Sequence, residues 1–309
     1  MIYTVTLNPA LDRELAVHAI AFDAVLRASA LRVDYGGKGF NVSRALKAMG
    51  TESVAVGFVG GPTGQRIADG LAGLGIATDF VEISGETRTN VSIVSETEAH
   101  HIKVNEAGPT ITAAETEALL DKVRALATDD DWWVLSGSLP PGMEPSIYAE
   151  LVEIVQRAGA RAVLDTSGAP LRHACEVRPY LAKPNAFEAS ELTGQPVSTT
   201  EEVAAVARTI HAMGVPNVMI SLGKDGALLH DSSQTCVATP PAIAEANPIG
   251  AGDSSVAGLV WGLSQGLAWP DVLRWSMACG AAAASLPGTA VGSRELVGQM
   301  TQRVRVEVI

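Results

Sequence analysis

Apolar runs of strand length alternate along the chain with longer stretches in which apolar residues recur at helical spacing. Polar and turn-forming residues bound the short runs, which is typical of buried strands. The predicted strands are Ile2–Leu7, Ser53–Val59, Trp132–Leu135, Arg161–Leu164, Tyr180–Ala182 and Val218–Leu222. The predicted helices are Asn41–Met49, Thr63–Leu74, Ala113–Ala127, Pro145–Ala158, Ala186–Leu192 and Thr200–Met213. This alternation predicts an α/β fold in which a mostly parallel sheet has crossover helices on both faces.

Two segments depart from the alternation. Residues 12–35 and 88–105 have the pattern of short strands with mixed polar and apolar positions, and no helix separates the strands of a pair. They predict a small antiparallel sheet that projects from the main core, either as a cover for an active site or as a plain hairpin excursion. Because the sequence contains no long linker or repeated unit, we expect residues 1–309 to form one domain with this sheet inserted.

Composition and charge narrow the class of protein. Of 309 residues, 47% are hydrophobic and 18% are charged, as in a globular protein with a large core. The net charge of -12 argues against a nucleic-acid partner, which would need a concentrated basic surface. The start of the chain lacks the pattern of a secretory signal, and the apolar segment Cys279–Leu286 is too short to cross a bilayer. We therefore expect a cytoplasmic protein without a membrane partner.

Several residue types with chemical potential are interpreted as structural. The cysteines Cys175, Cys236 and Cys279 are odd in number and lack CxxC spacing, so we expect them to be reduced core residues. The six histidines lack zinc-ligand spacing. Trp132 and Trp133 begin a predicted strand, where core packing is the usual role of an aromatic pair.

A glycine-rich turn near the C-terminus carries the strongest chemical signal. Gly250 and Gly252 permit tight backbone geometry, and the residues after Asp253 have a helical pattern. Backbone N–H groups of residues 251–253 at the start of that helix can point at an anion. A carboxylate there can take a proton from an alcohol while the N–H groups stabilise a transferring phosphoryl group. On this segment alone, an N-cap role for Asp253 fits equally well.

Two other phosphate-binding motifs fit this chain poorly. The third glycine of the dinucleotide motif GxGxxG is missing from the turn, and the turn lies far from an opening βαβ unit. No Walker A sequence GxxxxGK[ST] occurs in the chain. The anion site, if present, is therefore of another kind.

The turn and several other motifs together resemble one family. Residues 250–253 (GAGD) resemble the signature of the PfkB carbohydrate kinases, and residues 36–41 (GGKGFN) resemble their GGKGxN sugar-binding motif. Further matches in the family's order are residues 7–12 (LNPALD), 87–90 (TRTN), 136–140 (SGSLP), 183–185 (KPN) with Glu188, and 221–223 (SLG). The set is most similar to 1-phosphofructokinases, tagatose-6-phosphate kinases and minor 6-phosphofructokinases. The resemblance implies a ribokinase-like three-layer α/β/α sandwich with a β-sheet lid, ATP as co-substrate, Mg²⁺, and a homodimer formed through the lids.

The resemblance also implies roles for the matching residues. Asp253 would be the base, with Gly250, Ala251 and Gly252 as the anion hole. The sugar phosphate would contact Asp12, Gly37, Lys38, Asn41, Arg88, Lys103 and Ser138. The nucleotide would contact Lys183, Asn185, Ser221, Gly223, Lys224 and Gly226, and the metal would be held by Glu188, directly or through water, and by Asn185.

Without the family motifs, several of these residues have ordinary interpretations. Asn41 at a helix start is a candidate cap, and Asn185 with Glu188 is a candidate solvated helix face. Residues 221–226 (SLGKDG) have the pattern of a plain glycine turn after a strand. The chain also departs from the family at three positions: Pro248 and Ile249 precede GAGD, Phe40 replaces an isoleucine, and Ala290 replaces a glycine. Pro248 lacks an N–H, which can alter the approach to the anion hole.

The leading hypothesis is transfer of the ATP γ-phosphoryl group to a primary hydroxyl of a ketohexose monophosphate, with fructose 1-phosphate first. Tagatose 6-phosphate and fructose 6-phosphate are close alternatives. A non-catalytic protein that binds sugar phosphate is disfavoured, because a sensor needs neither a base nor a metal carboxylate. A kinase for free sugars or nucleosides is disfavoured by the cations Lys38, Arg88 and Lys103 near the predicted acceptor site.

Overall fold

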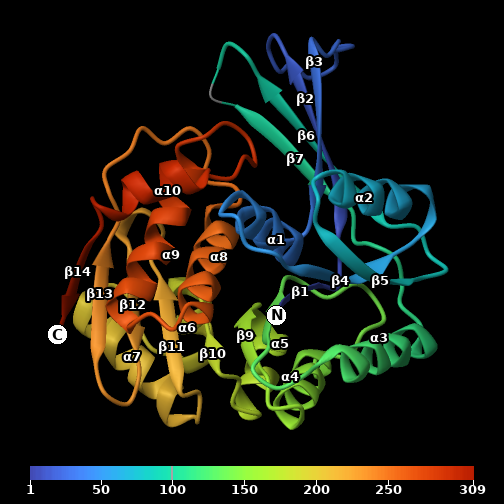
Figure 1. The fold of residues 1–309 in the computed structure, drawn as a ribbon. Helices are drawn as coiled ribbons and strands as arrows, with labels where there is room; N and C mark the ends of the chain where they lie inside the picture. The colour runs from blue at the N-terminus through green and yellow to red at the C-terminus, as the bar shows by residue number, and fades with distance from the viewer. Residues whose placement is uncertain (99) are drawn as a thin grey trace.

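A ten-stranded sheet forms the centre of the computed structural model, which describes residues 1–98 and 100–309 (Figure 1). Its strand order is β14-β13-β12-β11-β10-β9-β8-β1-β4-β5. The strands from β11 to β5 in this order are parallel, and the edge strands β12, β13 and β14 are antiparallel. In chain order they are β1 Ile2–Thr6, β4 Val54–Val59, β5 Ala77–Glu82, β8 Trp132–Ser136, β9 Arg161–Asp165, β10 Leu181–Ala182, β11 Asn217–Ser221, β12 Ala227–His230, β13 Thr235–Thr239 and β14 Arg305–Val308.

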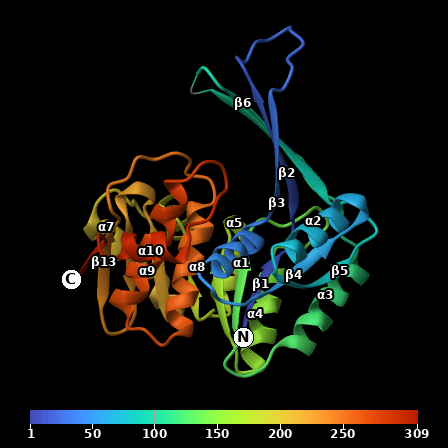
Figure 2. The ribbon, with the colours of Figure 1, turned by 45° about the horizontal axis from the view of Figure 1, so that its top comes forward.

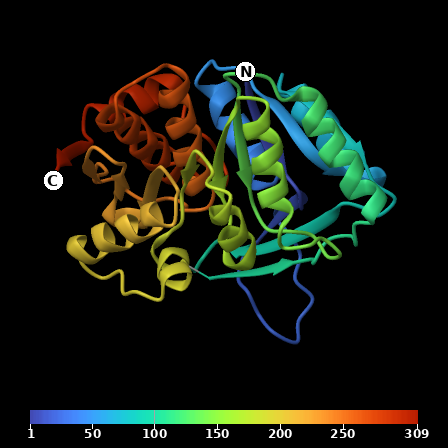
Figure 3. The same ribbon diagram turned by 90° about the horizontal axis from the view of Figure 1, so that it is seen from below.

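Helices cover both faces of this sheet, as the alternation predicts. Successive strand residues bury their side chains in different clusters: Val134 joins the cluster around α1, α8, α9 and α10, whereas Trp133 and Leu135 join the cluster around α3 to α7. The C-terminal helices and α3 lie at opposite ends of the molecule (Figures 1 and 3). The helices are α1 Lys38–Ala48, α2 Gly61–Gly73, α3 Ala113–Leu126, α4 Ile147–Arg157, α5 Gly168–Glu176, α6 Ala186–Thr193, α7 Thr200–Ala212, α8 Ala251–Ser264, α9 Trp269–Ala284 and α10 Arg294–Thr301.

A separate four-stranded sheet projects from the core (Figures 1 and 2). Its order is β3-β2-β6-β7, with β2 Ala10–Val17, β3 Ala30–Gly36, β6 Arg88–Ser95 and β7 His101–Asn105. We call it the lid sheet. The prediction of an antiparallel sheet holds for the hairpin partners β2 with β3 and β6 with β7, but the two hairpins join through the parallel pair β2 and β6. This parallel join is possible because β1 and β5, the strands that precede the two hairpins, are both parallel to β4 and so lead into β2 and β6 in the same direction.

The expectations for the three cysteines and for the tryptophan pair are confirmed. Cys175, Cys236 and Cys279 are buried and free, and Trp133 is fully buried and stacks on Tyr3 with ring centroids 4.3 Å apart. Residues 223–225 form a 3₁₀ turn between β11 and β12. Phe40 faces the core and packs against Phe80 at 5.3 Å between ring centroids. Within residues 1–98 and 100–309, no helix is long and apolar enough to span a membrane.

Candidate active site

Polar side chains gather where the parallel strands end. Asp165 is the last residue of β9, Lys183 directly follows β10, and Ser221 ends β11. Since parallel strands place their carboxyl ends at one edge of the sheet, these residues from distant parts of the chain meet there. The helix α1 and the first turn of α8 reach the same edge and complete the site.

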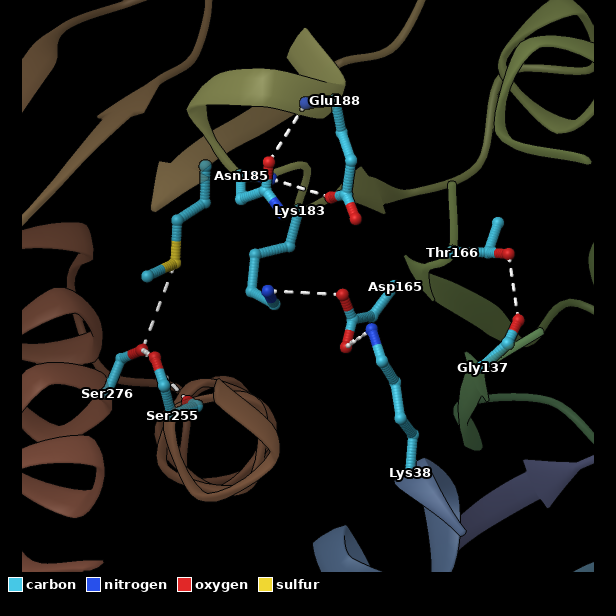
Figure 4. Close-up of polar contacts among 10 residues, drawn as sticks. Lys38, Gly137, Asp165, Thr166, Lys183, Asn185, Glu188, Ser255 and Ser276 are labelled. Carbon is cyan, nitrogen blue, oxygen red and sulfur yellow. Dashed lines mark hydrogen bonds and ion pairs between the residues drawn. The ribbon is translucent and has the colours of Figure 1, made fainter. Parts of the chain in front are cut away.

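A buried carboxylate joins two lysines at the centre of this edge. Asp165 Oδ1 lies 3.1 Å from Lys183 Nζ, and Asp165 Oδ2 lies 3.4 Å from Lys38 Nζ, so the lysines approach from opposite sides (Figure 4). Burial acts to raise the pKa of Asp165, but the two ammonium groups outweigh burial and the pKa is lowered. Asp165 in turn raises the pKa of Lys38, with smaller contributions from Asp253 and Glu188. Lys38 is therefore held charged beside the strand ends, and Lys183 is held there by its ion pair with Asp165.

The predicted base lies in the first turn of α8. Asp253 is not a cap, because Gly250 is the N-cap residue, with a φ of 81° that favours glycine, and no side chain caps this helix. The Asp253 side chain is buried, and its Oδ2 accepts a hydrogen bond of 2.8 Å from Asn41 Nδ2. Asn41 is likewise not a cap, since Gly37 is the N-cap of α1. The structure therefore joins the two family motifs through a direct contact between their polar side chains.

The environment of Asp253 suits a proton acceptor. Burial, followed by the negative charge of Asp165, raises its pKa to about 6. The hydrogen bond from Asn41 and the charges of Lys38 and Lys183 act in the opposite direction. A carboxylate with this pKa is ionised at neutral pH and is a stronger base than an ordinary aspartate.

The anion hole differs in one donor from the prediction. The N–H of Ala251 donates to Pro248 O over 3.2 Å, so it is engaged within the turn rather than directed at an anion. The N–H groups of Gly252 and Asp253 in the first turn of α8 remain as the candidate donors. A side-chain carbon placed on Gly252 would meet no atom within 4 Å, so this residue opens onto free space.

That space is a cavity of about 580 Å³ beside α8 and α9. Residues predicted to bind nucleotide lie on one side of it, and small or apolar residues form much of the rest, which suits a flat aromatic base with a polyphosphate. The lining includes Lys183, Ser221, Gly223, Lys224, Gly226, Pro240, Ile243, Gly252, Met277 and Ala281. Of the six predicted nucleotide residues, the structure brings five to this cavity, and Asn185 lies outside its lining.

The predicted sugar residues of the lid sheet share one face of it. Asp12 on β2 pairs in register with Asn90 on β6, and Asn90 Nδ2 donates to Asp12 Oδ1 over 2.8 Å. Lys103 on β7 pairs with Ser92, two residues beyond Asn90, so it lies on the same face. Burial raises the pKa of Asp12, while Asn90 and Lys103 act to lower it. The lid therefore presents a polar, charged face.

Arg88 and Ser138 lie near the base of this face. Arg88 Nη1 donates to Glu106 O over 2.8 Å and Nη2 donates to Asn8 O over 3.0 Å. The guanidinium is thus fixed in orientation, and its buried Nε–H has no protein partner. Ser138 is exposed in the loop after β8. Gly37 has a φ of 144°, and a side-chain carbon there would lie 2.6 Å from Thr6 Cγ2, so glycine is required by the backbone itself.

Asn185 and Glu188 form a capping box at the start of α6. Asn185 Oδ1 accepts from Glu188 N–H over 2.9 Å, and Glu188 Oε2 accepts from Asn185 N–H over 2.8 Å (Figure 4). Among the described residues, no cluster of three or more His, Cys, Asp or Glu side chains could hold a metal ion. Glu188 nevertheless lies near enough to Lys38 for its charge, like those of Asp165 and Asp253, to raise the pKa of Lys38. This donor set fits a hydrated Mg²⁺ bound mainly by phosphates, not an all-protein metal cage.

Two polar residues of the site were missed from the sequence. Asp165 follows the predicted strand Arg161–Leu164 directly, and a carboxylate at the end of a buried parallel strand is a signal that could have found it. Arg44 lies three residues after Asn41 on α1 and contacts it. Helical spacing from an already suspected residue was the available signal for Arg44.

An α/β sandwich with a projecting lid sheet, a buried carboxylate in a glycine turn and a cavity beside it is the architecture of the ribokinase-like kinases. The pfkB family carbohydrate kinase model matches residues 6–295. The chain therefore belongs to the pfkB family of carbohydrate kinases.

Named relatives agree with this assignment. The chain is 36% identical over 306 residues to the 1-phosphofructokinase of Bacillus subtilis, covering 99% of both chains. It is 34% identical over 310 residues to the 1-phosphofructokinase of Borreliella burgdorferi, covering 100% of this chain and 99% of that protein. The structure of phosphofructokinase-2 from Escherichia coli in complex with potassium superposes with a TM-score of 0.93 at 30% identity, covering 97% of this chain and 98% of that one.

Proposed function

We propose that this chain transfers the γ-phosphoryl group of ATP to the free primary hydroxyl of fructose 1-phosphate, giving fructose 1,6-bisphosphate. The observation that carries the proposal is Asp253, a buried carboxylate in the first turn of α8 with a pKa raised to about 6. It lies between the nucleotide-sized cavity and the polar face of the lid sheet, and Asn41 holds it. The full-length similarity to 1-phosphofructokinases supports the choice of acceptor.

The chain's residues divide the reaction between them. A carboxylate oxygen of Asp253 takes the proton of the sugar hydroxyl. In the same step the hydroxyl oxygen bonds to the γ-phosphorus of ATP while the bond from the γ-phosphorus to the β–γ bridging oxygen breaks. The ADP oxygen so released keeps the bonding electrons. The N–H groups of Gly252 and Asp253 stabilise the negative charge on the transferring group. Lys183, fixed by Asp165, supplies positive charge on the nucleotide side of the same edge.

Mg²⁺ that arrives with the nucleotide would be held beside Asn185 and Glu188. When bound, it supplies neutralisation of phosphate charge. In the capping box the Glu188 carboxylate accepts a hydrogen bond from the backbone N–H of Asn185, which fixes its position. The carboxylate therefore needs no further side-chain partner to hold its negative charge in place.

The lid supplies recognition of the acceptor's own phosphate in this proposal. Lys38, Arg88 and Lys103 are the candidate cations, and Asp12 and Asn41 are the candidate partners of sugar hydroxyls. Ser138 in the loop after β8 and Gly37 at the start of α1 would line the same acceptor site.

A homodimer through the lid and a cytoplasmic location complete the proposal. Register places Leu15, Leu31, Ile93 and Ile102 on the face opposite the polar one. Leu31 is 52% exposed, and Phe22 and Val25 in the β2–β3 loop are 84% and 83% exposed. An apolar face of this kind is suited to a second lid. Three free, buried cysteines are consistent with a reducing compartment.

The proposal is tested by coupled ADP-release assays on fructose 1-phosphate, fructose 6-phosphate, tagatose 6-phosphate and free fructose. We expect the highest kcat/KM for fructose 1-phosphate. A higher value for fructose 6-phosphate would favour the second candidate, a 6-phosphofructokinase, which the fold similarity to E. coli phosphofructokinase-2 in complex with fructose-6-phosphate supports (TM-score 0.91, 29% identity). No phosphorylation of any member, with binding retained, would favour a non-catalytic sugar-phosphate protein.

A further inference from the structure

The contact between Asn41 and Asp253 depends on which end of the Asn41 amide faces the carboxylate. In the structure Nδ2 donates to Asp253 Oδ2 over 2.8 Å. The reversed amide would turn its carbonyl oxygen toward the carboxylate, and two acceptors repel each other. Asp253 therefore favours one orientation of the amide, and a second contact on the carbonyl side would hold that orientation in place.

Arg44 makes that second contact. Its Nη1 donates to Asn41 Oδ1 over 3.2 Å, from a position three residues further along α1 and on the same side of the helix. A guanidinium has donors and no acceptor, so it is compatible only with the carbonyl end of the amide. With Arg44 on one side and Asp253 on the other, only one orientation of the Asn41 amide satisfies both neighbours.

Two further elements hold Arg44. Its Nη2 donates to Thr289 O over 3.2 Å, and its Nη1 donates to Thr289 Oγ1 over 3.5 Å. Nη2 also lies 3.7 Å from Asp34 Oδ1 on lid strand β3. The Arg44 side chain is only 13% exposed, and a charged group so enclosed is stable only where its donors are paired. These contacts fix the guanidinium at one place.

The loop that carries Thr289 is shaped for this arrangement. Arg32 of β3 donates from Nη2 to Thr289 Oγ1 over 2.9 Å and pairs with Asp34 over 2.7 Å. Its guanidinium lies over Gly288, where any side chain would collide with it and where φ is +59°. Residues 287–292 thus contact the lid strand and Arg44 together.

We propose that Arg44 is a positioning residue for the catalytic carboxylate. It holds the Asn41 amide with its NH₂ group toward Asp253, and the Thr289 loop and strand β3 hold Arg44 in turn. The inference rests on the proposed role of Asp253 as the base. It assigns Arg44 no contact with sugar or nucleotide.

The test is a double-mutant cycle on kcat, with Arg44→Met, Asn41→Ala and the combination, at saturating ATP and fructose 1-phosphate. Each single variant should lower kcat by about 10- to 100-fold, because the base is misplaced. The double variant should be no slower than Asn41→Ala, and the KM for ATP should not change. Arg44→Lys is the second variant if Arg44→Met does not fold. Lysine keeps the charge without the fork that bridges three acceptors, so kcat should fall here too.

The acidic limb of the pH profile of kcat distinguishes positioning of the base from a purely structural role of Arg44, which would leave this limb unchanged. The Asn41 hydrogen bond lowers the pKa of Asp253, so Asn41→Ala and Arg44→Met should shift the limb to higher pH. Asp165, Lys38 and Lys183 around Asp253 are the same in both variants, whereas Arg44, which also interacts with Asp253, loses its charge in Arg44→Met and keeps it in Arg44→Lys. A shift of the limb in Arg44→Lys therefore reports the Asn41 amide and not the loss of a charge.

Arg294→Met is the matched control, since Arg294 Nη1 donates to Met49 O at the C-terminal end of α1 and lies outside the contacts of Asn41, Arg44 and Thr289. Its effect should add to that of Asn41→Ala. Additivity of Arg44→Met or Arg44→Lys with Asn41→Ala, or unchanged kcat in either arginine variant, would overturn the inference. Asp253→Asn in the same series separates the two proposals, because near-normal turnover there overturns the base assignment alone.

Discussion

The proposed nucleotide side and the proposed acceptor side of the site are built in different ways. The nucleotide side is a cavity of about 580 Å³ within the main core, between the strand ends and the helices α8 and α9. The acceptor side lies under the lid sheet, whose β7 is mostly exposed and whose β3 has exposed residues at its outer end. One side is therefore formed by the large sheet and its helices, whereas the other depends on a sheet with few neighbours.

This difference predicts which residues should determine the rate and which should determine the choice of acceptor. Groups held in the core, such as Asp165 and Asp253, are fixed before any substrate arrives, which favours charge stabilisation without reorganisation. Groups on the lid are free to differ among related enzymes without disturbing the core. Changes in the core should lower turnover with every acceptor, and changes in the lid should alter the choice of acceptor.

The largest effect is expected where the two sides meet. Asp253→Asn keeps the shape of the side chain but cannot accept the proton, so kcat should fall by at least ~10²-fold. The affinity for sugar phosphate should change much less. Steady-state kinetics with fructose 1-phosphate measures this, and binding calorimetry provides the control. A kcat for Asp253→Asn near that of the unmutated protein would mean that Asp253 is not the base between the nucleotide and the acceptor.

The lid cations should govern the choice of acceptor. One charge-assisted hydrogen bond contributes roughly 1.5–3 kcal/mol, so Arg88→Ala should lower kcat/KM for fructose 1-phosphate by about 10- to 100-fold. The kcat/KM for free fructose should change little. Before mutation, kcat/KM for fructose 1-phosphate should exceed that for free fructose by at least ~10²-fold. Because Arg88 also binds two backbone carbonyl groups, Lys103→Ala is the cleaner partner variant, as Lys103 is exposed. Equal losses of kcat/KM for fructose 1-phosphate and for free fructose would contradict recognition of the acceptor's phosphate by the lid sheet.

The buried base should lower the stability of the folded protein at neutral pH. The pKa of Asp253 is raised from 3.8 to about 6, so between these values the folded protein keeps a proton that the unfolded chain releases. Its stability therefore falls as pH rises through 6. Asp253→Asn removes this penalty and should raise the free energy of unfolding at pH 7.5 by roughly 1–3 kcal/mol. Urea unfolding at pH 4.5 and 7.5 measures it, and an equal gain at both values would contradict the raised pKa.

The smallest effect concerns the metal. Glu188→Gln retains the capping box, because glutamine serves at that position, but loses the negative charge. The Mg²⁺ concentration for half-maximal rate should rise by about 10-fold. Glu202→Gln is the matched control, since Glu202 occupies the same position in the capping box of α7. An unchanged Mg²⁺ titration for Glu188→Gln, or an equal shift for Glu202→Gln, would remove Glu188 from the metal site.

Local sequence pattern was enough to predict most of the parallel core and its helices, because buried strands and amphipathic helices each have a hydrophobic pattern that is visible within a short segment. All six predicted strands and all six predicted helices are present, with ends shifted by up to three residues. Strands β5, β12, β13 and β14 and helices α5, α9 and α10 were not predicted. Strands β12 and β14 have four residues each, which is too few to show a period, and α9 has small apolar residues on most sides.

The site was less predictable than the core, because its geometry depends on contacts between distant residues. Motifs located Asp253 and Asn41, but nothing local shows that these two touch across 212 positions. The same holds for Lys38, Asp165 and Lys183, whose pairing needs two strands and a helix in place. The engaged N–H of Ala251 was not predictable either, since it depends on how Pro248 turns the chain.

The junction between strand β3 and helix α1 sets a limit on chain length. The strand ends at Gly36 and the helix begins at Lys38, so Gly37 alone separates the lid from the helix that carries Asn41. One added residue in α1 ahead of Asn41 would turn the later side chains by about 100° around the helix axis. The β2–β3 loop at residues 18–29 has no such constraint. Insertions and deletions in the lid should therefore be tolerated at its tip and rejected at its base.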